Sequence, residues 1–341
     1  MTRNQLSFRT SLLALALAGL TTSTLSAAEP GPFLGRWALT IPGGGAGWLG
    51  VTKENGYYDA SILWGGGSVV PVSSVCFEGD LMWITRVREV KRKDASGKVV
   101  RTHQIGEAIM ARVSGDTLTL TQINPHDDGN GMTRNEFTGK RIPDVGPAPD
   151  LSKVKFAAPI TLFNGKDLTG WRLTDPGQRN GWRAEGGLLI NDAKQEEGKP
   201  HIAYGNLRTE REFEDFNLTL EVNVPKGGNS GIYLRGIYEV QVADTYGRPL
   251  DSHNMGGIYS RIAPKVSAEK PAGEWQTYDI TLMDRHVTVI LNGQKIIDNQ
   301  PLLGCTGGAL WSDQFRPGPL YLQGDHTGVS YRNIVLKPVA K

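Results

Sequence analysis

The chain lacks several features that mark common classes of protein. Only two cysteines occur among its 341 residues, so a dense disulfide framework is excluded. It contains no dinucleotide-binding fingerprint, which argues against a nucleotide cofactor. No apolar run is long enough to span a bilayer. With 37 basic and 35 acidic side chains, the chain has no long-range attraction for nucleic acid or anionic lipid.

Residues 1–28 predict a secretion signal that is removed from the mature protein. Arg3 and Arg9 form a positive start, residues 12–20 an apolar core, and Ser26-Ala27-Ala28 a cleavage site of small residues. No cysteine follows the cleavage site, so no lipid anchor is expected there. We therefore expect a periplasmic or secreted protein whose mature chain is close to neutral.

Glycine and proline are abundant, whereas long helical patterns are scarce. The 43 glycines and 19 prolines between short β-rich runs predict an all-β protein. Pro143, Pro147 and Pro149 form a stiff segment that cannot join a central ladder. The predicted organisation is a small antiparallel β-barrel or sandwich domain over residues 31–142, a proline-rich linker over 143–156 and a second β domain over 157–341.

In the first domain, short β-rich runs separated by glycine turns predict about eight antiparallel strands in an up-and-down barrel or flattened sandwich. Its Gly35-Arg36-Trp37 opening and a late arginine resemble lipocalin-like barrels. The basic run 86–93 predicts a solvated hairpin tip. Cys76 and Cys305 are predicted to be two buried free thiols. The role of this domain stays open among glycan binding, partner docking and shielding of the second domain.

Clean alternation of apolar and polar residues marks the second domain. Residues 216–222 and 278–282 each bury one face, as in a two-sheet sandwich or jelly roll. Asn292-Gly293 predicts a type I′ hairpin. These patterns predict a sandwich of two antiparallel sheets after the linker.

The stretch 229–244 carries an unusual set of polar residues on strands. Period-two reading places Arg235, Glu239 and Gln241 on one face, with Asp244 further along and Tyr233 and Tyr238 beside them. Amides and carboxylates bind hydroxyls, and a tyrosine ring covers the C–H face of a sugar. The alternatives are a site for a polyhydroxylated ligand and a solvated outer face with ordinary charge pairs.

Several motifs occur in an order that resembles a known family. They are residues 162–171 (LFNGKDLTGW), the core 229–244, Gly257-Ile258-Tyr259, Gly273-Glu274-Trp275-Gln276 and Leu320-Tyr321-Leu322-Gln323. Together they resemble the 3-keto-disaccharide hydrolase family over roughly residues 157–338. The resemblance implies a concanavalin-like or laminin-G-like jelly roll that cleaves glycosides oxidised to a ketone at C3. It also implies a separate glycoside 3-dehydrogenase that supplies the ketone.

The resemblance implies a role for each polar residue. Glu239 is expected to be the general base or a metal ligand, or alternatively an ion-pair partner of Arg235. His326 is expected to transfer protons or bind the same metal, which is a divalent ion such as calcium, manganese or zinc. The remaining expected residues are Arg235 at the enolate oxygen or a sugar hydroxyl, Asp244 as a second ligand or an acid, and Gln241, Tyr233, Tyr238, Tyr259 and Gln323 around the sugar.

Two other functions compete with this hypothesis. The same sandwich hosts non-catalytic carbohydrate-binding, lectin-like modules, because a fold does not fix a function. A conventional glycosidase needs two carboxylates at a set separation around the glycosidic bond. Whether Glu239, Asp244 and His326 converge in one pocket distinguishes the lectin from an enzyme.

Overall fold

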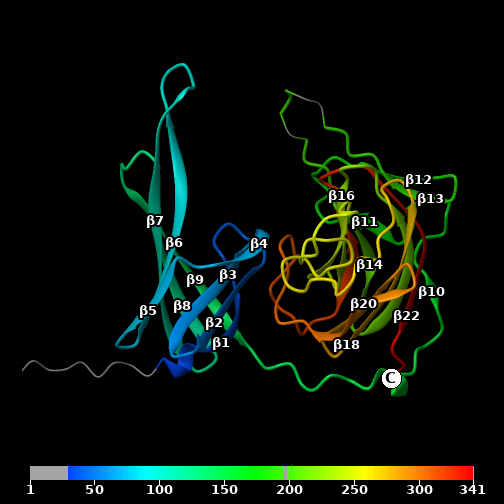
Figure 1. The fold of residues 1–341 in the computed structure, drawn as a ribbon, viewed down its shortest axis with the longest axis horizontal. Helices are drawn as coiled ribbons and strands as arrows, with labels where there is room; N and C mark the ends of the chain where they lie inside the picture. Colours follow the sequence, from blue (N-terminus) through cyan, green and yellow to red (C-terminus); the bar gives the residue numbers. More distant parts are fainter. Residues whose placement is uncertain (1–29, 196–197, 201, 341) are drawn as a thin grey trace, which may run out of the picture.

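The computed structural model describes residues 30–195, 198–200 and 202–340. The predicted signal, residues 1–28, lies outside the described residues. The predicted periplasmic or secreted location therefore stays a prediction. Strands dominate the described residues, and two 3₁₀ turns, Gly31–Phe33 and Leu151–Lys153, are their only helical elements. No helix in this part of the chain is long and apolar enough to cross a membrane. The predicted all-β class is therefore confirmed (Figure 1).

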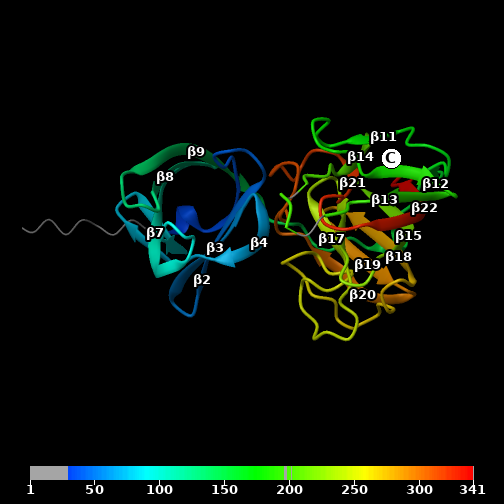
Figure 2. The ribbon, with the colours of Figure 1, turned by 90° about the horizontal axis from the view of Figure 1, so that it is seen from above.

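The first nine strands form one antiparallel sheet that curls into a barrel. Their order is β4-β3-β2-β1-β9-β8-β7-β6-β5, so the sequence neighbours β4 and β5 lie at its two ends. Figure 2 shows the sheet as a ring. The strands are β1 (Gly35–Leu39), β2 (Gly47–Glu54), β3 (Tyr57–Trp64), β4 (Gly66–Pro71), β5 (Ser74–Glu78), β6 (Leu81–Lys93), β7 (Val99–Ser114), β8 (Thr117–Pro125) and β9 (Met132–Ile142).

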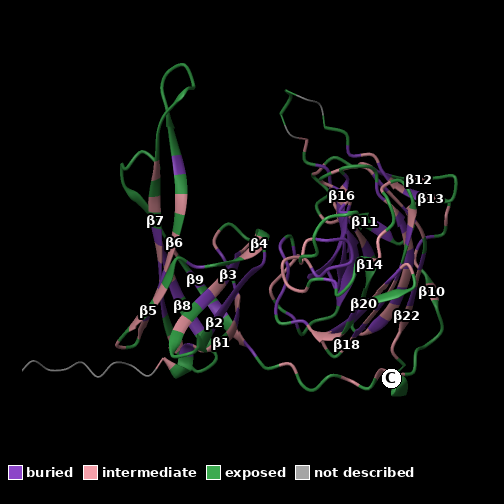
Figure 3. Cartoon of the chain, in the orientation of Figure 1, coloured by how far each residue is buried: buried purple, intermediate pink, exposed green. Residues whose placement is uncertain are grey.

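The predicted barrel is confirmed, with one strand more than the sequence pattern indicated. β5 was missed because its five residues alternate between exposed and half-buried positions and carry little apolar signal. β6 and β7 extend well beyond the rest of the barrel as a long hairpin (Figure 1). Residues 91–101 at its end are all exposed (Figure 3). The predicted tip, residues 86–93, is displaced, because β6 continues to Lys93 with Val90 buried and the turn lies at residues 94–98.

The second half of the chain forms a two-sheet sandwich. One sheet has the order β12-β13-β22-β15-β18-β19-β20, with β10 also paired to β22, and the other has the order β11-β14-β21-β16-β17. The strands are β10 (Ile160–Thr161), β11 (Trp171–Leu173), β12 (Trp182–Glu185), β13 (Leu188–Asn191), β14 (Leu207–Phe213), β15 (Phe216–Asn223), β16 (Asn229–Leu234), β17 (Tyr238–Ala243), β18 (Trp275–Met283), β19 (His286–Leu291), β20 (Gln294–Pro301), β21 (Gly318–Leu322) and β22 (Val329–Pro338).

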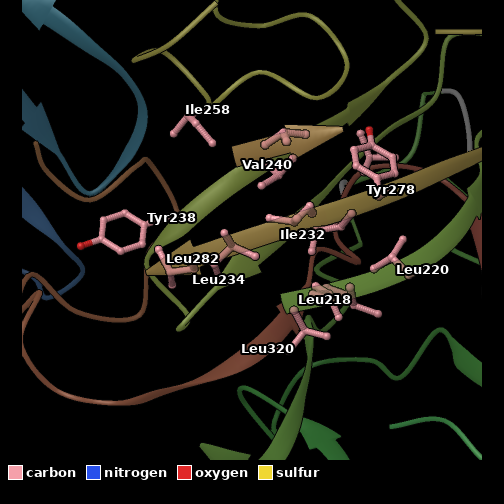
Figure 4. Packing of buried hydrophobic residues seen from close by; sticks show 14 of the residues in the cluster. Leu218, Leu220, Ile232, Leu234, Tyr238, Val240, Ile258, Tyr278, Leu282 and Leu320 are labelled. Atoms are coloured by element: carbon pink, nitrogen blue, oxygen red, sulfur yellow. The ribbon is translucent and has the colours of Figure 1, made fainter. Parts of the chain in front are cut away.

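The sandwich core lies between these two sheets. β15 and β18 bury every second residue, as their alternation predicted. Leu218 and Leu220 of β15 pack in the same cluster as Ile232 and Val240 of the five-stranded sheet (Figure 4). β17 differs, because all six of its residues are buried, polar ones included. Something therefore covers both faces of this strand.

The structure tests two local predictions, the hairpin at Asn292-Gly293 and the state of the two cysteines. Asn292 and Gly293 have φ values of 51° and 80° and join β19 to β20, which confirms the tight hairpin. Both cysteines are unbridged, as predicted, but the predicted burial of Cys76 is wrong. It lies on an exposed position of β5, whereas Cys305 is buried.

The barrel and the sandwich share part of one hydrophobic cluster. Ala46, Trp48, Leu63 and Ile142 of the barrel belong to the same set of packed buried residues as the sandwich core. A second cluster, which includes Trp37 and Leu49, fills the barrel itself. The predicted domain boundaries stay a prediction, but the two folded parts are in apolar contact.

Candidate active site

The β16–β17 hairpin determines which side chains share a face. Tyr233 lies opposite Glu239, and Gly231 lies opposite Gln241. These four residues therefore project from the face of the sheet that points away from the sandwich core, because directly paired residues share a side. Leu234, opposite Tyr238, lies on the core side. The burial of β17 on both faces thus places a carboxylate and an amide in a covered, polar environment.

Glu239 is the most unusual residue on this face, since it is only 3% exposed and has no cationic partner among the described residues. Its Oε2 lies 2.8 Å from the hydroxyl of Tyr233. Its Oε1 lies over Gly231, where an added Cβ would come within 2.4 Å of it. Glycine at position 231 therefore makes the space that the carboxyl group occupies. Burial raises the pKa of Glu239 from 4.5 to about 8.

The hydrogen bonds around Tyr233 agree with a neutral Glu239. The Tyr233 hydroxyl lies 2.7 Å from the carbonyl oxygen of Gly307 and 2.8 Å from Glu239 Oε2. A hydroxyl has one proton to donate, so it cannot donate to both oxygens at once. Both contacts are satisfied when Glu239 is protonated and donates to Tyr233, which in turn donates to Gly307. Ionisation of Glu239 requires the Tyr233 proton to turn from Gly307 to the carboxylate.

A second tyrosine and a carboxylate complete the surroundings of Glu239. The Tyr321 ring stacks on Tyr233 with ring centres 4.0 Å apart. The negative charge of Asp325 also raises the pKa of Glu239, as a smaller effect than burial. Asp325 Oδ1 lies 3.6 Å from Nδ1 of His326, whose side chain is 43% exposed. The structure therefore brings Glu239 and the Asp325–His326 pair to one region, with His326 on its open side.

Several oxygen acceptors at the same end of β16 and β21 lack a donor. Asn229 Oδ1, Gln323 Oε1 and Asp325 Oδ1 are buried and have no hydrogen-bond partner in the described part of the chain. Ser230 donates to the Gln323 carbonyl, and Gln323 donates its N–H to Gly231, so these residues are neighbours. Unpaired buried acceptors are rare, because each forfeits a hydrogen bond.

The structure moves two predicted residues away from this region. Arg235 lies in the turn after β16, with φ at 54°, and its guanidinium donates to the carbonyls of Gln314 and Arg316. The alternative ion pair between Arg235 and Glu239 is therefore wrong. Tyr238 was expected beside the polar face, but it packs in the core cluster with Leu234 (Figure 4). Its hydroxyl donates to Gln314.

The other predicted residues lie at varying distances from Glu239. Asp244 lies past the end of β17, where its side chain accepts the backbone N–H of Gly227, which precedes β16. Gln241 is on the Glu239 face, although its Oε1 accepts from the neighbouring Val242 N–H. Tyr259 donates its backbone N–H to the Glu239 carbonyl, and its half-buried ring lies edge-on to His253.

The donor set does not resemble a protein-built metal centre. The described residues contain no group of three or more histidine, cysteine, aspartate or glutamate side chains that would hold a metal ion. Glu239 and His326, the predicted ligands, are linked only through Asp325. These residues do not fit the three protein ligands that a catalytic zinc usually has. The divalent metal stays a prediction, and no step below depends on it.

Sequence reasoning missed three contributors to the site. Gly231, Gly307 and Tyr321 shape or contact the surroundings of Glu239, yet none was named as a site residue. Tyr321 had a detectable signal, since alternation in residues 320–323 places it on the same face as Gln323. The contact of Gly307 with Tyr233 spans 74 residues of sequence and leaves no local pattern.

Comparison with known proteins shows which proteins this chain is similar to. A curated 3-keto-disaccharide hydrolase from Bacteroides thetaiotaomicron is 27% identical over 41% of this chain, and this chain spans only 57% of that protein. A crystal structure from Parabacteroides distasonis, provisionally assigned as a glycosyl hydrolase, is 32% identical over 53% of this chain and 83% of its own, with a TM-score of 0.44. Another structure from that organism with the same provisional assignment is 22% identical, with a TM-score of 0.42.

The family match covers the sandwich and leaves the barrel unassigned. Residues 158–337, just over half of the chain, match the family described as a 3-keto-alpha-glucoside-1,2-lyase-like domain. The matched range contains every strand of the two sandwich sheets except the last residue of β22. It includes Glu239, Tyr233 and the Asp325–His326 pair. The chain belongs to the family of 3-keto-alpha-glucoside-1,2-lyase-like domains.

Proposed function

We propose that the sandwich cleaves glycosides that carry a ketone at C3, with Glu239 as the base that removes the proton at C2. The observation that carries this proposal is a buried carboxyl group whose pKa, about 8, lies near a physiological operating pH. A raised pKa makes a carboxylate a stronger base toward a carbon acid. The match of residues 158–337 to the 3-keto-alpha-glucoside-1,2-lyase-like family supports a 3-keto-glycoside as the substrate.

The reaction divides into steps that balance. Glu239 takes the C2 proton, and the electron pair of the C2–H bond enters the enolate that ends on the C3 oxygen. The enolate then re-forms the ketone as a C1–C2 double bond forms and the C1–O bond breaks. The leaving oxygen keeps that electron pair and accepts a proton, which releases the aglycone as an alcohol. Addition of water across C1–C2 completes a net hydrolysis.

Tyr233 and His326 have distinct roles in this proposal. When Glu239 gives up its proton, the Tyr233 hydroxyl turns toward the carboxylate and stabilises it, and when Glu239 is protonated the hydroxyl turns back to Gly307. His326 is half-exposed and its Nδ1 lies 3.6 Å from Asp325 Oδ1, and its role in this proposal is to donate a proton to the enolate or leaving oxygen. Arg235 takes no part, because backbone carbonyls occupy its donors.

The ketone must come from a separate oxidation. Converting the C3 hydroxyl to a carbonyl removes a hydride, and this chain has no dinucleotide-binding fingerprint to accept one. A separate glycoside 3-dehydrogenase is therefore the proposed functional partner. The predicted secretion signal places both reactions in the periplasm or outside the cell as a further prediction.

A second candidate is ordinary glycoside hydrolysis. The carboxylate of Asp325, which acts on Glu239 through its charge, favours it, because glycosidases use two carboxyl groups. This candidate needs no ketone, so the two functions predict different substrates.

The test compares a 3-keto-glucoside with its unoxidised parent, with and without EDTA, and follows release of the aglycone. We expect release from the ketone alone and a loss of roughly 10²–10⁴-fold in Glu239→Gln, the usual contribution of a general base. Glu210→Gln, an exposed change in the same sheet, is the matched control and is expected to keep full activity. Release from the parent would instead establish the glycosidase, and sugar binding without release would leave a lectin.

A further inference from the structure

One segment of the sandwich lies between the barrel and Glu239. We name residues 303–312 the clamp segment. On its inner side, the Gly307 carbonyl accepts from Tyr233, and Thr306 Oγ1 accepts the Glu239 backbone N–H at 3.0 Å. The Gly308 carbonyl accepts from Tyr321 at 3.2 Å. Three consecutive residues of this segment thus hold Glu239 and the two tyrosines beside it.

The barrel holds the other side of the same segment. Trp48 of β2 donates its indole N–H to the Leu303 carbonyl at 3.1 Å. Gly65, in the turn between β3 and β4, accepts the Gly308 N–H at 3.1 Å. Ser312 Oγ accepts from Gly47 and donates to the Leu39 carbonyl, at 2.9 and 2.8 Å. The barrel therefore contacts the clamp segment at its start, middle and end.

Close backbone approach makes this contact specific. A Cβ on Gly307 would lie 2.0 Å from the Gly67 carbonyl oxygen, so only glycine allows the barrel turn to come this near. A Cβ on Gly304 would lie 2.5 Å from the Trp48 indole nitrogen. The ten residues of the clamp segment therefore include both the contacts with Glu239 and its tyrosines and the contacts with the barrel. Movement of the barrel must therefore move the site.

A half-buried arginine reinforces the junction. The Arg261 guanidinium stacks on Trp48 at 4.4 Å and donates to the Cys305 carbonyl through two N–H groups, at 2.6 and 2.8 Å. Burial lowers the pKa of Arg261 to about 10, which leaves it charged at neutral pH. Trp48 thus supports the segment twice, directly at Leu303 and through Arg261 at Cys305.

We propose that the barrel is a positioning element of the active site, which acts through the clamp segment to fix Tyr233 and the Glu239 carboxyl group and to exclude water from them. Its effect on catalysis rests on the function proposed above, whereas its effect on the carboxyl group does not. The proposal assigns a role to the part of the chain that the family match does not cover.

The barrel acts by shape rather than by charge. The ionisable groups that affect the pKa of Glu239 or are affected by its charge all belong to the sandwich: Tyr233 of β16, Tyr321 of β21, Asp325 after β21 and Tyr331 of β22. The barrel residues on the clamp segment, Trp48, Gly65 and Gly67, carry no charge. Loosening this contact therefore admits water and leaves the charges in place.

The test measures the Glu239 titration directly, in the full chain and without substrate. Infrared difference spectra against Glu239→Gln isolate the carbonyl band of the protonated carboxyl group, and its loss with rising pH gives the midpoint. Trp48→Ala is the test variant. Trp83→Ala, the same change on β6 between β5 and β7, is the matched control away from the junction. Near-UV circular dichroism verifies the fold of both variants.

We expect the midpoint to fall toward the ordinary carboxyl range in Trp48→Ala and to stay unchanged in Trp83→Ala. If Trp48→Ala does not fold, Ser312→Ala, which removes both hydrogen bonds of the Ser312 hydroxyl to the barrel, is expected to shift the midpoint the same way by less. An unchanged midpoint in a folded junction variant overturns the positioning role. Absence of turnover in the wild-type chain would refute the proposed function without affecting this result.

Discussion

Replacement of Glu239 by glutamine should change how the stability of the protein depends on pH. In the folded chain burial raises the pKa of this carboxyl group to about 8, whereas its ordinary value is 4.5. Between these values the folded chain holds a proton that the unfolded chain releases. Unfolding therefore becomes more favourable as pH rises, and the stabilising contribution is complete only below pH 4.5.

The magnitude follows from the size of the shift. Each pH unit within this window changes the free energy of unfolding by about 1.4 kcal/mol, so the whole window is worth at most about 5 kcal/mol. Glutamine mimics the neutral carboxyl group, because its amide N–H₂ donates to Tyr233 as the protonated acid does, but it does not titrate. Between pH values about two units apart in this window, the wild type should lose about 3 kcal/mol more than Glu239→Gln.

Urea unfolding of both proteins at those two pH values measures this difference. Near-UV circular dichroism follows the tertiary packing of both folded parts. Subtracting the result for the variant from that for the wild type cancels the contribution of every other titrating group to the free energy of unfolding. Equal pH dependence in the two proteins would refute the reasoning, since it would mean that the Glu239 carboxyl is ionised, or freely hydrated, in the folded chain.

Three further predictions concern individual side chains. Tyr233→Phe removes a hydrogen bond that lowers the pKa of Glu239, so the rise of kcat/KM with pH should move to higher pH. An unchanged pH profile would exclude the proposed turning of the Tyr233 hydroxyl toward the Glu239 carboxylate. Gly231→Ala places a Cβ 2.4 Å from Glu239 Oε1 and should cost about 1–3 kcal/mol of unfolding free energy, seen as a lower melting temperature. A thiol reagent should modify exposed Cys76 in the folded protein, but Cys305, whose pKa burial raises to about 11, only after denaturation; two rapid reactions would contradict this.

Alternation and turn chemistry were sufficient to predict most of the strands. The alternating residues of β15 and β18 bury one face because a sandwich needs one apolar face per sheet. Asn292-Gly293 forms its hairpin because both positions adopt the left-handed backbone that these residues tolerate. Such signals depend only on neighbouring residues, so packing elsewhere in the chain does not change them.

Period-two reading failed where the chain leaves the strand. Leu234 pairs with Tyr238 across a loop of three residues, so Arg235 belongs to the turn and Tyr238 returns to the core side. The alternation keeps its phase through this turn, since Leu234, Tyr238 and Val240 all lie on the core side. Arg235 left the predicted site because it lies in the turn, and Tyr238 because its neighbour Glu239 occupies the other face.

The sequence by itself determined an all-β chain, the strand that carries Glu239 and the family of the sandwich, because these depend on periodicity and on motifs of neighbouring residues. Only the tertiary structure decided the chemistry of that carboxyl group. Its pKa is raised by burial, because Gly231 makes room for the carboxyl group beneath the clamp segment, and the clamp segment is held by Trp48 from the barrel. Burial is a property of packing between distant segments, so no local pattern reveals it.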